Sequence, residues 1–254
     1  MISLAGKAAL VTGGSRGIGA ATVKLFAEAG ADVVFGYHRD RDAAEQVEQE
    51  ARKHGTRIES LKADLARTVE AKKLVDFAHE RLGRIDILVA NAGIWNAVEA
   101  PIEKLTEREW DDMIRVNLKS VYALVHDCVP RMIAQRGGRI VAVSSVAAQF
   151  GPAFHSHYAA SKAALIGFVK SLAAELGPHG ILVNCIAPGW VETDMSAPRL
   201  NTPKTKKLAA DASPLHRIAK PSEIAGPILF AVSDLATFVT GAVINVNGGS
   251  FRCG

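Results

Sequence analysis

The sequence is poor in cysteine and aromatic residues, and it contains no long uninterrupted hydrophobic segment. Its three cysteines, Cys128, Cys185 and Cys253, are an odd number, which argues against a disulfide scaffold and indicates the reducing cytoplasm. Residues 228–246 are apolar, but polar residues and a glycine interrupt them. They therefore predict a helix, a turn and a strand instead of a membrane span. No charged and apolar leader precedes the first predicted strand, so no secretory signal peptide is expected.

Charge of one sign is not concentrated anywhere in the chain. Lysine and arginine total 30, aspartate and glutamate total 26, and the net charge is +4. The densest basic group, Lys204, Lys206 and Lys207, is short, so neither a nucleic-acid partner nor a membrane association is predicted. No internal repeat or low-complexity linker divides the sequence, and we expect one domain over residues 1–254.

Short apolar segments rich in β-formers alternate with longer amphipathic segments along the whole chain. This alternation predicts βαβ units and therefore an α/β, doubly wound fold with helices on both faces of a parallel sheet. The expected strands are residues 8–11, 32–37, 57–62, 85–90, 139–143, 182–186 and 242–246. The expected helices are residues 17–29, 41–53, 69–81, 107–135, 158–176 and 222–232.

Two further patterns concern the ends and connections of these elements. Thr106 and Glu109 have capping-box spacing directly before the longest expected helix. The stretch from Trp190 to about Lys220 is rich in proline and predicts a long irregular loop, of the kind that covers binding sites.

A glycine-rich turn joins the first expected strand to the first helix, with the sequence Thr12-Gly13-Gly14-Ser15-Arg16-Gly17-Ile18-Gly19. The unpaired N–H groups and the positive dipole end of a helix N-terminus attract anions, and glycine lets a pyrophosphate approach the backbone. Strand, turn and helix at the start of a doubly wound fold predict a dinucleotide site. The alternative is a tight turn that binds nothing.

The end of the second strand predicts which dinucleotide binds. An acidic residue there would hydrogen-bond to the 2′-hydroxyl of NAD and repel the 2′-phosphate of NADP. The sequence has Tyr37, His38 and Arg39 instead, and Arg16 in the glycine turn adds a second guanidinium. Asp40 follows closely and opposes the assignment. We predict NADP(H) in preference to NAD(H), the alternative being a solvated basic loop.

Tyr158 and Lys162 are four residues apart in an expected helix, so their side chains share one face. An ammonium about 4 Å from the phenol oxygen, at an effective dielectric constant of about 20, gives an attraction of roughly 4 kcal/mol. That attraction would lower the tyrosine pKa by about three units, towards neutrality. Such a phenol exchanges protons with an alcohol or carbonyl oxygen. The same spacing is common by chance, so the pair alone does not define a catalytic site.

Ser144 and Ser145 directly follow a predicted strand whose carboxyl end faces the same crevice as the glycine turn. A hydroxyl at this place holds a substrate oxygen while Tyr158 donates its proton. The alternative is a local turn or a helix cap.

Together with Asn91-Ala92-Gly93 and Pro188-Gly189, these segments resemble the ordered motif set of the short-chain dehydrogenase/reductase family. The resemblance covers nearly the whole chain. It implies one Rossmann-type domain with about seven parallel strands, commonly assembled as a homotetramer.

The resemblance also implies a role for each matching residue. Tyr158 would be the catalytic acid, Lys162 would lower its pKa and bind the nicotinamide ribose, and Ser145 would orient the substrate. Asn117 resembles the residue that holds a proton-relay water, the alternative being a kink in the middle of the helix. Ile186 and Thr193 match positions that touch the nicotinamide carboxamide, and a cap or turn residue is the alternative for such contacts. The remaining cofactor contacts implied are Gly13, Ser15, Arg16, Gly17, Ile18, Gly19, Tyr37, His38, Arg39, Asp64, Leu65, Asn91, Ala92, Gly93, Pro188, Gly189 and Val191; no metal site is predicted.

Within the family, residues 158–167, 184–195 and 238–249 most resemble 3-oxoacyl-carrier-protein reductases. Arg136 matches a position at which those enzymes place a basic residue towards the acidic carrier, but His179 stands at the second such position. A 3-oxoacyl thioester is therefore one expected substrate, and an acyl carrier protein one expected partner. A sugar, a steroid or a small alcohol remains an alternative substrate, and a non-catalytic dinucleotide sensor an alternative function.

Four aromatic residues, Trp95, Phe150, Phe154 and Trp190, follow strand ends or accompany the catalytic motifs. They predict an apolar substrate pocket, with packing or subunit contacts as the alternative.

Overall fold

The computed structural model describes residues 2–252, so Cys253 lies outside the described residues. Its strands are β1 (Ala8–Thr12), β2 (Asp32–Tyr37), β3 (Ile58–Lys62), β4 (Ile87–Ala90), β5 (Gly138–Val143), β6 (Ile181–Pro188) and β7 (Val243–Val246). They form one parallel sheet of seven strands in the order β3-β2-β1-β4-β5-β6-β7. The predicted fold class is confirmed. The first three strands are added in one direction from β1, and the chain then returns to place β4 on the other side of β1. The direction of strand addition therefore reverses between β1 and β4.

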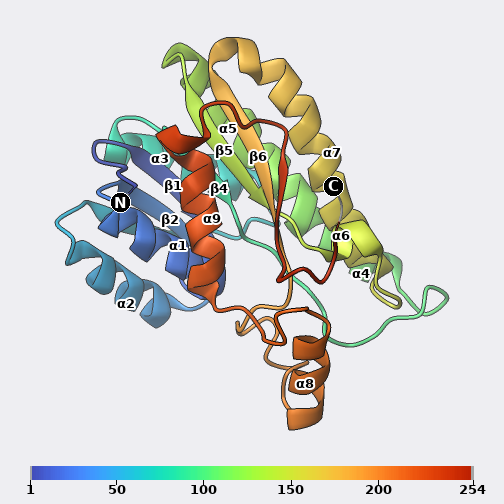
Figure 1. Ribbon diagram of the computed structural model, residues 1–254. Helices are drawn as coiled ribbons and strands as arrows, with labels where there is room; N and C mark the ends of the chain where they lie inside the picture. The colour runs from blue at the N-terminus through green and yellow to red at the C-terminus, as the bar shows by residue number, and fades with distance from the viewer. Residues whose placement is uncertain (1, 253–254) are drawn as a thin grey trace.

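Helices cover both faces of the sheet, as Figure 1 shows. The larger helices are α1 (Gly17–Glu28), α2 (Arg41–Arg52), α3 (Thr68–Leu82), α5 (Ser120–Ala134), α7 (Ser156–Leu176) and α9 (Pro221–Val232). One buried cluster joins the sheet to α1, α2 and α9, and the other joins it to α3, α5 and α7. The sheet therefore lies between two helical layers.

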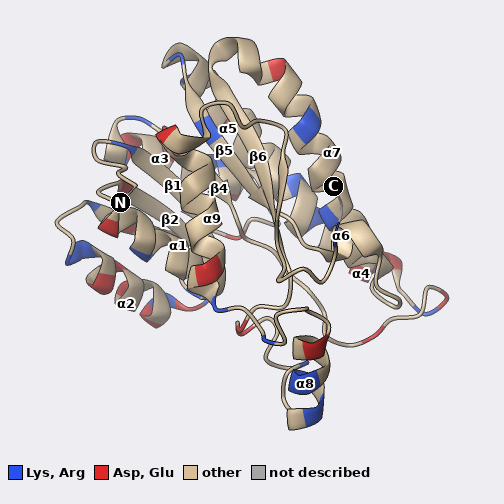
Figure 2. Cartoon of the chain, in the orientation of Figure 1, with Lys and Arg blue, Asp and Glu red and all other residues tan. Residues whose placement is uncertain are grey.

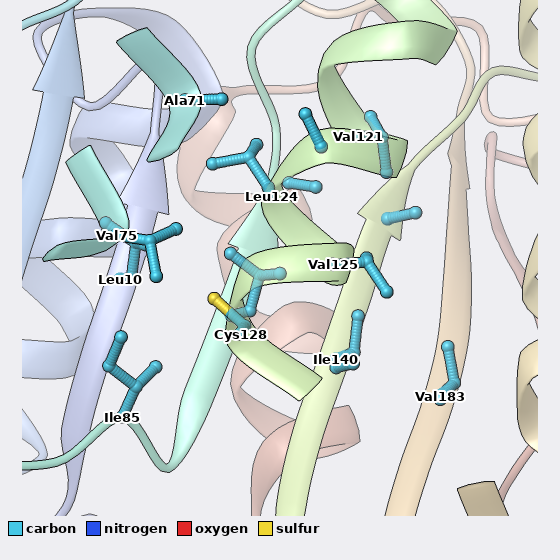
Figure 3. Packing of buried hydrophobic residues seen from close by; sticks show 14 of the residues in the cluster. Leu10, Ala71, Val75, Ile85, Val121, Leu124, Val125, Cys128, Ile140 and Val183 are labelled. Atoms are coloured by element: carbon cyan, nitrogen blue, oxygen red, sulfur yellow. The ribbon is translucent and has the colours of Figure 1, made fainter. Parts of the chain in front are cut away.

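The alternation of side chains along each strand divides the apolar residues between the two layers. Leu10 belongs to the cluster on the α3 and α5 side, whereas its neighbours Ala9 and Val11 belong to the cluster on the α1 and α9 side. Figure 3 shows Leu10 among side chains that include Val75 of α3 and Leu124 of α5. These residues are almost fully buried, and each large one contributes about 1.5–3 kcal/mol by its removal from water.

The longest expected helix, residues 107–135, is divided in the structure. Helix α4 (Glu107–Ile114) leads into a π-helical segment, Arg115–Lys119, and α5 follows. The capping box of Thr106 and Glu109 before α4 is confirmed. The π segment contains Asn117, whose side chain is fully buried. Such a local widening of a helix commonly marks a functional position.

The prediction of an irregular loop over residues 190–220 is wrong in part. The segment includes α8 (Pro203–Asp211), which projects away from the sheet (Figure 1). Thr202 caps this helix by accepting a hydrogen bond from the Thr205 N–H, and Pro203 occupies the first turn. Pro203 therefore begins a helix here and does not interrupt one. A second short helix, α6 (Ala147–Phe150), was also not predicted.

Charged side chains of both signs are mixed over the surface, and lysines gather on α8 (Figure 2). Residues 228–246 form the end of α9, a short 3-10 turn (Asp234–Ala236) and β7, as predicted. Within residues 2–252, every helix is too short or too polar to cross a bilayer.

Candidate active site

A cleft of about 1040 Å³ opens along the carboxyl ends of the central strands. Its wall includes residues that directly follow β1, β2, β4, β5 and β6, so it spans the point at which the strand order reverses. In open α/β sheets this is where ligands bind.

The glycine turn after β1 forms one end of the cleft. Gly13 and Gly17 have φ angles of 65° and 55°, a left-handed conformation that favours glycine. Arg16 precedes the first turn of α1 without capping it by a side-chain hydrogen bond, so the N-terminal N–H groups stay available to an anion. Ser15 and Ile18 also line the cleft.

Gly19 has a different role from the other residues of the turn. It does not line the cleft, and a Cβ atom at this position would lie 2.0 Å from the Gly13 carbonyl oxygen. Gly19 therefore allows α1 to pack closely against the turn instead of contacting a ligand.

Hydrogen bonds tie the ends of β1 and β4 together beneath the turn. The Thr12 hydroxyl accepts from the backbone N–H groups of Asn91 and Ala92, each at 3.0 Å. The Asn91 amide donates back to the Thr12 carbonyl at 2.9 Å. Asn91, Ala92 and Gly93 all line the cleft, so these bonds fix its floor.

Basic groups surround the cleft beyond the end of β2. Tyr37, His38 and Arg39 all line it, and Arg39 has no ion-pair partner among residues 2–252. His38 lies 3.8 Å from the Asp64 carboxylate, and Arg16 lies 3.6 Å from that of Asp194. Asp64 and Leu65, which follow β3, also line the cleft.

Asp40 was the residue that opposed NADP in the sequence. In the structure its carboxylate accepts a hydrogen bond of 2.9 Å from the Ala43 N–H and caps α2. The cap occupies one carboxylate oxygen, and Asp40 lines the cleft, so its second oxygen can still accept from a ribose 2′-hydroxyl. Asp40 therefore still opposes the choice of NADP, which rests on Arg39 and Arg16.

Ser145, Tyr158 and Lys162 come together in the middle of the cleft, from β5 and α7. The Ser145 hydroxyl acts on the Tyr158 phenol in the direction that lowers the pKa of the tyrosine. Ser145 also accepts from the Ala147 N–H at 3.1 Å, so it serves the local turn as well. Ser144 is committed elsewhere, because its hydroxyl donates to the Lys162 carbonyl at 2.7 Å. The two serines are thus distinguished by their partners.

In this structure the Lys162 ammonium makes no hydrogen bond to the Tyr158 phenol, and the lowering of the tyrosine pKa by Lys162 stays a prediction. The Lys162 ammonium donates to the Val143 carbonyl at 2.9 Å and lies 6.0 Å from the centre of the Tyr158 ring. Burial raises the pKa of Tyr158, and the Ser145 hydroxyl opposes this only in part. Burial also lowers the pKa of Lys162 to about 8. The strand carbonyl, and not the phenol, is the partner of the ammonium.

Asn117 lies behind the cleft and does not line it. Its side-chain oxygen accepts from the Ile94 N–H at 2.8 Å, and its nitrogen donates to the Ile94 carbonyl and the Ser161 hydroxyl, each at 3.0 Å. A Cβ atom on Gly93 would lie 3.1 Å from the Asn117 oxygen and 3.2 Å from the Lys162 nitrogen. Asn117 and Lys162 therefore meet over Gly93.

The segment after β6 closes the cleft from the other side. Pro188, Gly189, Val191 and Thr193 all line it. A Cβ atom on Gly17 would lie 3.1 Å from the Thr193 methyl group, so this segment reaches the glycine turn. Ile186 is fully buried in β6 and does not reach the cleft.

Aromatic side chains line the cleft beside Tyr158. The Trp95 ring lies 5.9 Å from that of Trp190, 6.4 Å from that of Tyr158 and 5.4 Å from that of His155. Phe150 also lines the cleft, as predicted, whereas Phe154 points elsewhere and is 49% exposed.

Sequence reasoning missed two members of this wall, His155 and Phe251. The Phe251 ring lies 6.4 Å from that of Phe150 although about a hundred residues separate them in the chain. No local pattern could reveal that contact. His155 had a usable signal, because it stands one helical turn before Tyr158.

Arg136 and His179, the positions compared with carrier-binding residues, lie just before the amino ends of the neighbouring strands β5 and β6. They precede β5 and β6, which pair in the register Gly138 to Ile181. A Cβ atom on Gly180 would lie 3.2 Å from the Arg136 carbonyl oxygen. The length of the strands separates this surface from the cleft.

Within residues 2–252, no group of three or more His, Cys, Asp or Glu side chains has the geometry of a metal site. Cys128 and Cys185 are buried free thiols, and burial raises their pKa values to about 12 and about 11.

Comparison with known proteins places the chain among relatives of similar length. A family model described as enoyl-(acyl carrier protein) reductase matches residues 13–250. The 3-oxoacyl-[acyl-carrier-protein] reductase of Aquifex aeolicus is 38% identical over 250 residues, which are 98% of this chain and 99% of the relative. The reductase of the same name from Thermotoga maritima is 40% identical over 246 residues, 97% and 98% of the two chains.

Solved structures give the same result. A short chain dehydrogenase from Burkholderia cenocepacia in complex with NADP has a TM-score of 0.91 and 36% identity, and the match covers 97% of this chain and 98% of the other. A blue fluorescent protein from a metagenomic library, in complex with NADPH, has a TM-score of 0.92 and 34% identity over 98% and 100% of the two chains.

Proposed function

Because the chain belongs to the short-chain dehydrogenase/reductase family, we propose that it is an NADPH-dependent oxidoreductase that reduces a ketone to a secondary alcohol. The observation that carries the proposal is the meeting of Ser145, Tyr158 and Lys162 in a cleft that ends at an open helix N-terminus. A dinucleotide sensor needs the helix end but not the three polar side chains.

The shape of the cleft fits a dinucleotide. Two left-handed glycines and uncapped N–H groups form a cradle for a pyrophosphate, and Arg39 and Arg16 supply positive charge for a 2′-phosphate beside the His38 imidazole. When bound, the cofactor supplies the hydride. The residues that would hold it are Gly13, Ser15, Arg16, Gly17, Ile18, Tyr37, His38, Arg39, Asp64, Leu65, Asn91, Ala92, Gly93, Pro188, Gly189, Val191 and Thr193, with Gly19 supporting the turn from behind.

Tyr158 is the proton donor in this proposal, and Ser145 holds the substrate oxygen beside it. Because burial raises the pKa of Tyr158, its phenol stays protonated at neutral pH. A protonated phenol suits carbonyl reduction, in which the oxygen must gain a proton. Lys162 holds the nicotinamide ribose, and Asn117 positions Lys162 and a relay water from behind Gly93.

The proposed substrate is a 3-oxoacyl thioester, with an acyl carrier protein as the partner that delivers it. The names of the two relatives and the apolar wall of the cleft support this choice. A sugar, a steroid or a small alcohol is the second candidate substrate, and the family model's description adds reduction of a carbon–carbon double bond as a reaction to test.

We expect the purified chain to oxidise NADPH in the presence of a 3-oxoacyl thioester at least about tenfold more efficiently than with a cyclic ketone, a keto sugar or a 2-enoyl thioester. Steady-state kcat/KM values for this panel test the prediction. Preference for another member of the panel would replace the proposed substrate. Failure of every member to oxidise NADPH would refute the proposed function.

The cofactor preference has its own test. NADPH should exceed NADH in kcat/KM, and the double variant His38→Ala, Arg39→Ala should lose about tenfold or more of that preference, because Arg39 contributes a charge-assisted contact and His38 a hydrogen bond. Arg108→Ala removes an exposed arginine outside the cleft and serves as the control. An NADH preference in the unmodified chain would contradict the assignment.

Two further parts of the proposal rest on the family and the composition. We propose a homotetramer, for which light scattering should give about four times the mass of the chain. We also propose a cytoplasmic location, in keeping with the buried thiols of Cys128 and Cys185, and recovery of the protein outside the cytoplasmic fraction would oppose it.

A further inference from the structure

The His155 side chain lies in the cleft without the hydrogen bonds that a buried imidazole normally makes. It is only 7% exposed, it lines the cleft, and its Nδ1 atom is buried without a hydrogen-bond partner among residues 2–252. Buried polar atoms in folded proteins are nearly always paired. Nδ1 itself is enclosed by protein atoms, so a molecule in the cleft would meet the other ring nitrogen, Nε2, which is not among the enclosed atoms.

His155 stands one turn before Tyr158, at the start of α7. His155 is the N-cap residue of α7, with φ −132° and ψ 34°, so helical spacing does not fix its direction. The imidazole and the phenol face one region because the Trp95 ring lies against both. The side chain makes no capping hydrogen bond to α7. Burial lowers the pKa of His155, so the ring is neutral and offers one donor and one acceptor.

The surroundings of His155 belong to the substrate part of the cleft. The Trp95 ring contacts both the His155 ring and the Tyr158 ring, with centroid distances of 5.4 and 6.4 Å. Glu99 and Arg199, which act electrostatically on His155, form an ion pair of 2.8 Å and also line the cleft. These neighbours come from the segments after β4 and β6 and not from the glycine turn.

We propose that the His155 imidazole donates a hydrogen bond to a second oxygen of the substrate. A short carbon chain connects the group that carries this oxygen to the ketone that is reduced. Tyr158 and Ser145 hold the ketone oxygen, His155 holds the second oxygen, and the carbon atoms between them lie against Trp95. The site thereby selects 3-oxoacyl compounds, whose thioester carbonyl supplies that oxygen. This inference rests on the proposed function, since it needs Tyr158 to fix the first oxygen.

A pair of small substrates tests the selection without a carrier protein. One is the N-acetylcysteamine thioester of 3-oxobutanoate, and the other is the matched ketone in which a methylene replaces the thioester carbonyl. We expect the His155→Phe variant to lower the ratio of their kcat/KM values about tenfold or more, because the second oxygen would be buried without a partner. His155→Gln keeps an N–H donor and should restore most of the ratio.

His157 provides a matched control. It is 2% exposed and its Nδ1 atom also lacks a partner among residues 2–252, but it does not line the cleft. His157→Phe should leave the ratio unchanged. Should His155→Phe fail to fold, as judged by its NADPH dissociation constant, His155→Leu takes its place.

The outcomes separate this inference from the proposed function. A ratio that stays within about twofold of the wild-type value in the His155 variant, or an equal fall in the His157 variant, overturns the role of His155 alone. Failure of the unmodified protein to reduce either substrate with NADPH overturns both.

Discussion

Replacement of Tyr158 by phenylalanine should lower kcat for NADPH-dependent ketone reduction about a hundred- to ten-thousandfold, the range that a positioned acid contributes. The variant removes the proton donor and its interaction with the Ser145 hydroxyl but keeps the ring that contacts Trp95. The NADPH dissociation constant should therefore change by less than about threefold. Stopped-flow turnover and fluorescence titration measure the two quantities separately.

Tyr122→Phe is the matched control for that experiment. Tyr122 lies on α5 with 51% of its surface exposed, and it does not line the cleft, so its hydroxyl should not affect turnover. Retention of more than about a tenth of wild-type kcat by the Tyr158 variant would remove Tyr158 from the chemistry.

Replacement of Lys162 by methionine should stop turnover and at the same time stabilise the fold. The ammonium is buried, and lowering its pKa from 10.5 to about 8 corresponds to a cost of about 3 kcal/mol at neutral pH. Methionine removes this charge, although it leaves the Val143 carbonyl without the ammonium donor, which costs about 1 kcal/mol. We expect the free energy of unfolding to rise by about 1–3 kcal/mol in urea titrations at pH 7.

This stabilisation should depend on pH in a defined direction. Between pH 8 and pH 10.5 the unfolded wild-type chain binds a proton at Lys162 that the folded chain has released. Wild-type stability therefore gains with rising pH, and the advantage of the methionine variant, complete below pH 8, is lost towards pH 10.5. Lys170→Met, at an exposed position of the same helix, should show no such dependence. A methionine variant less stable than wild type at pH 7 would show that burial of the Lys162 ammonium does not lower the free energy of unfolding.

The sheet could be predicted from sequence because its strands are buried on both faces. Apolar segments such as residues 32–37 are short and lie between expected helices. Because strands covered by helices on both faces are apolar almost throughout, these segments predict the strands of a parallel sheet. Boundaries shifted by one or two residues where pairing extends past the apolar segment, as in β6, which runs to Pro188. Helical spacing did not predict the π segment at Asn117, whose side chain makes tertiary hydrogen bonds to Ile94, although a kink there was the alternative reading of that residue.

The residues that line the site could be predicted from sequence, but the hydrogen bonds between them could not. Motif order brings Ser145, Tyr158 and the glycine turn to one edge of the sheet. The direction in which Lys162 points depends on Val143, a backbone carbonyl in another element, and no spacing rule contains that information. The same limit applies to Phe251, which reaches the cleft only through the tertiary path of the C-terminal segment.

The most direct test of the central claim uses NADPH that carries deuterium on the transferable position of its nicotinamide ring. Incubated with the protein and a 3-oxoacyl thioester, it should yield a 3-hydroxyacyl product with one deuterium on the carbinol carbon, detected by mass spectrometry, and the Tyr158→Phe variant should yield almost none. A product without deuterium, or NADPH bound in the cleft and never oxidised with any ketone, would contradict the account.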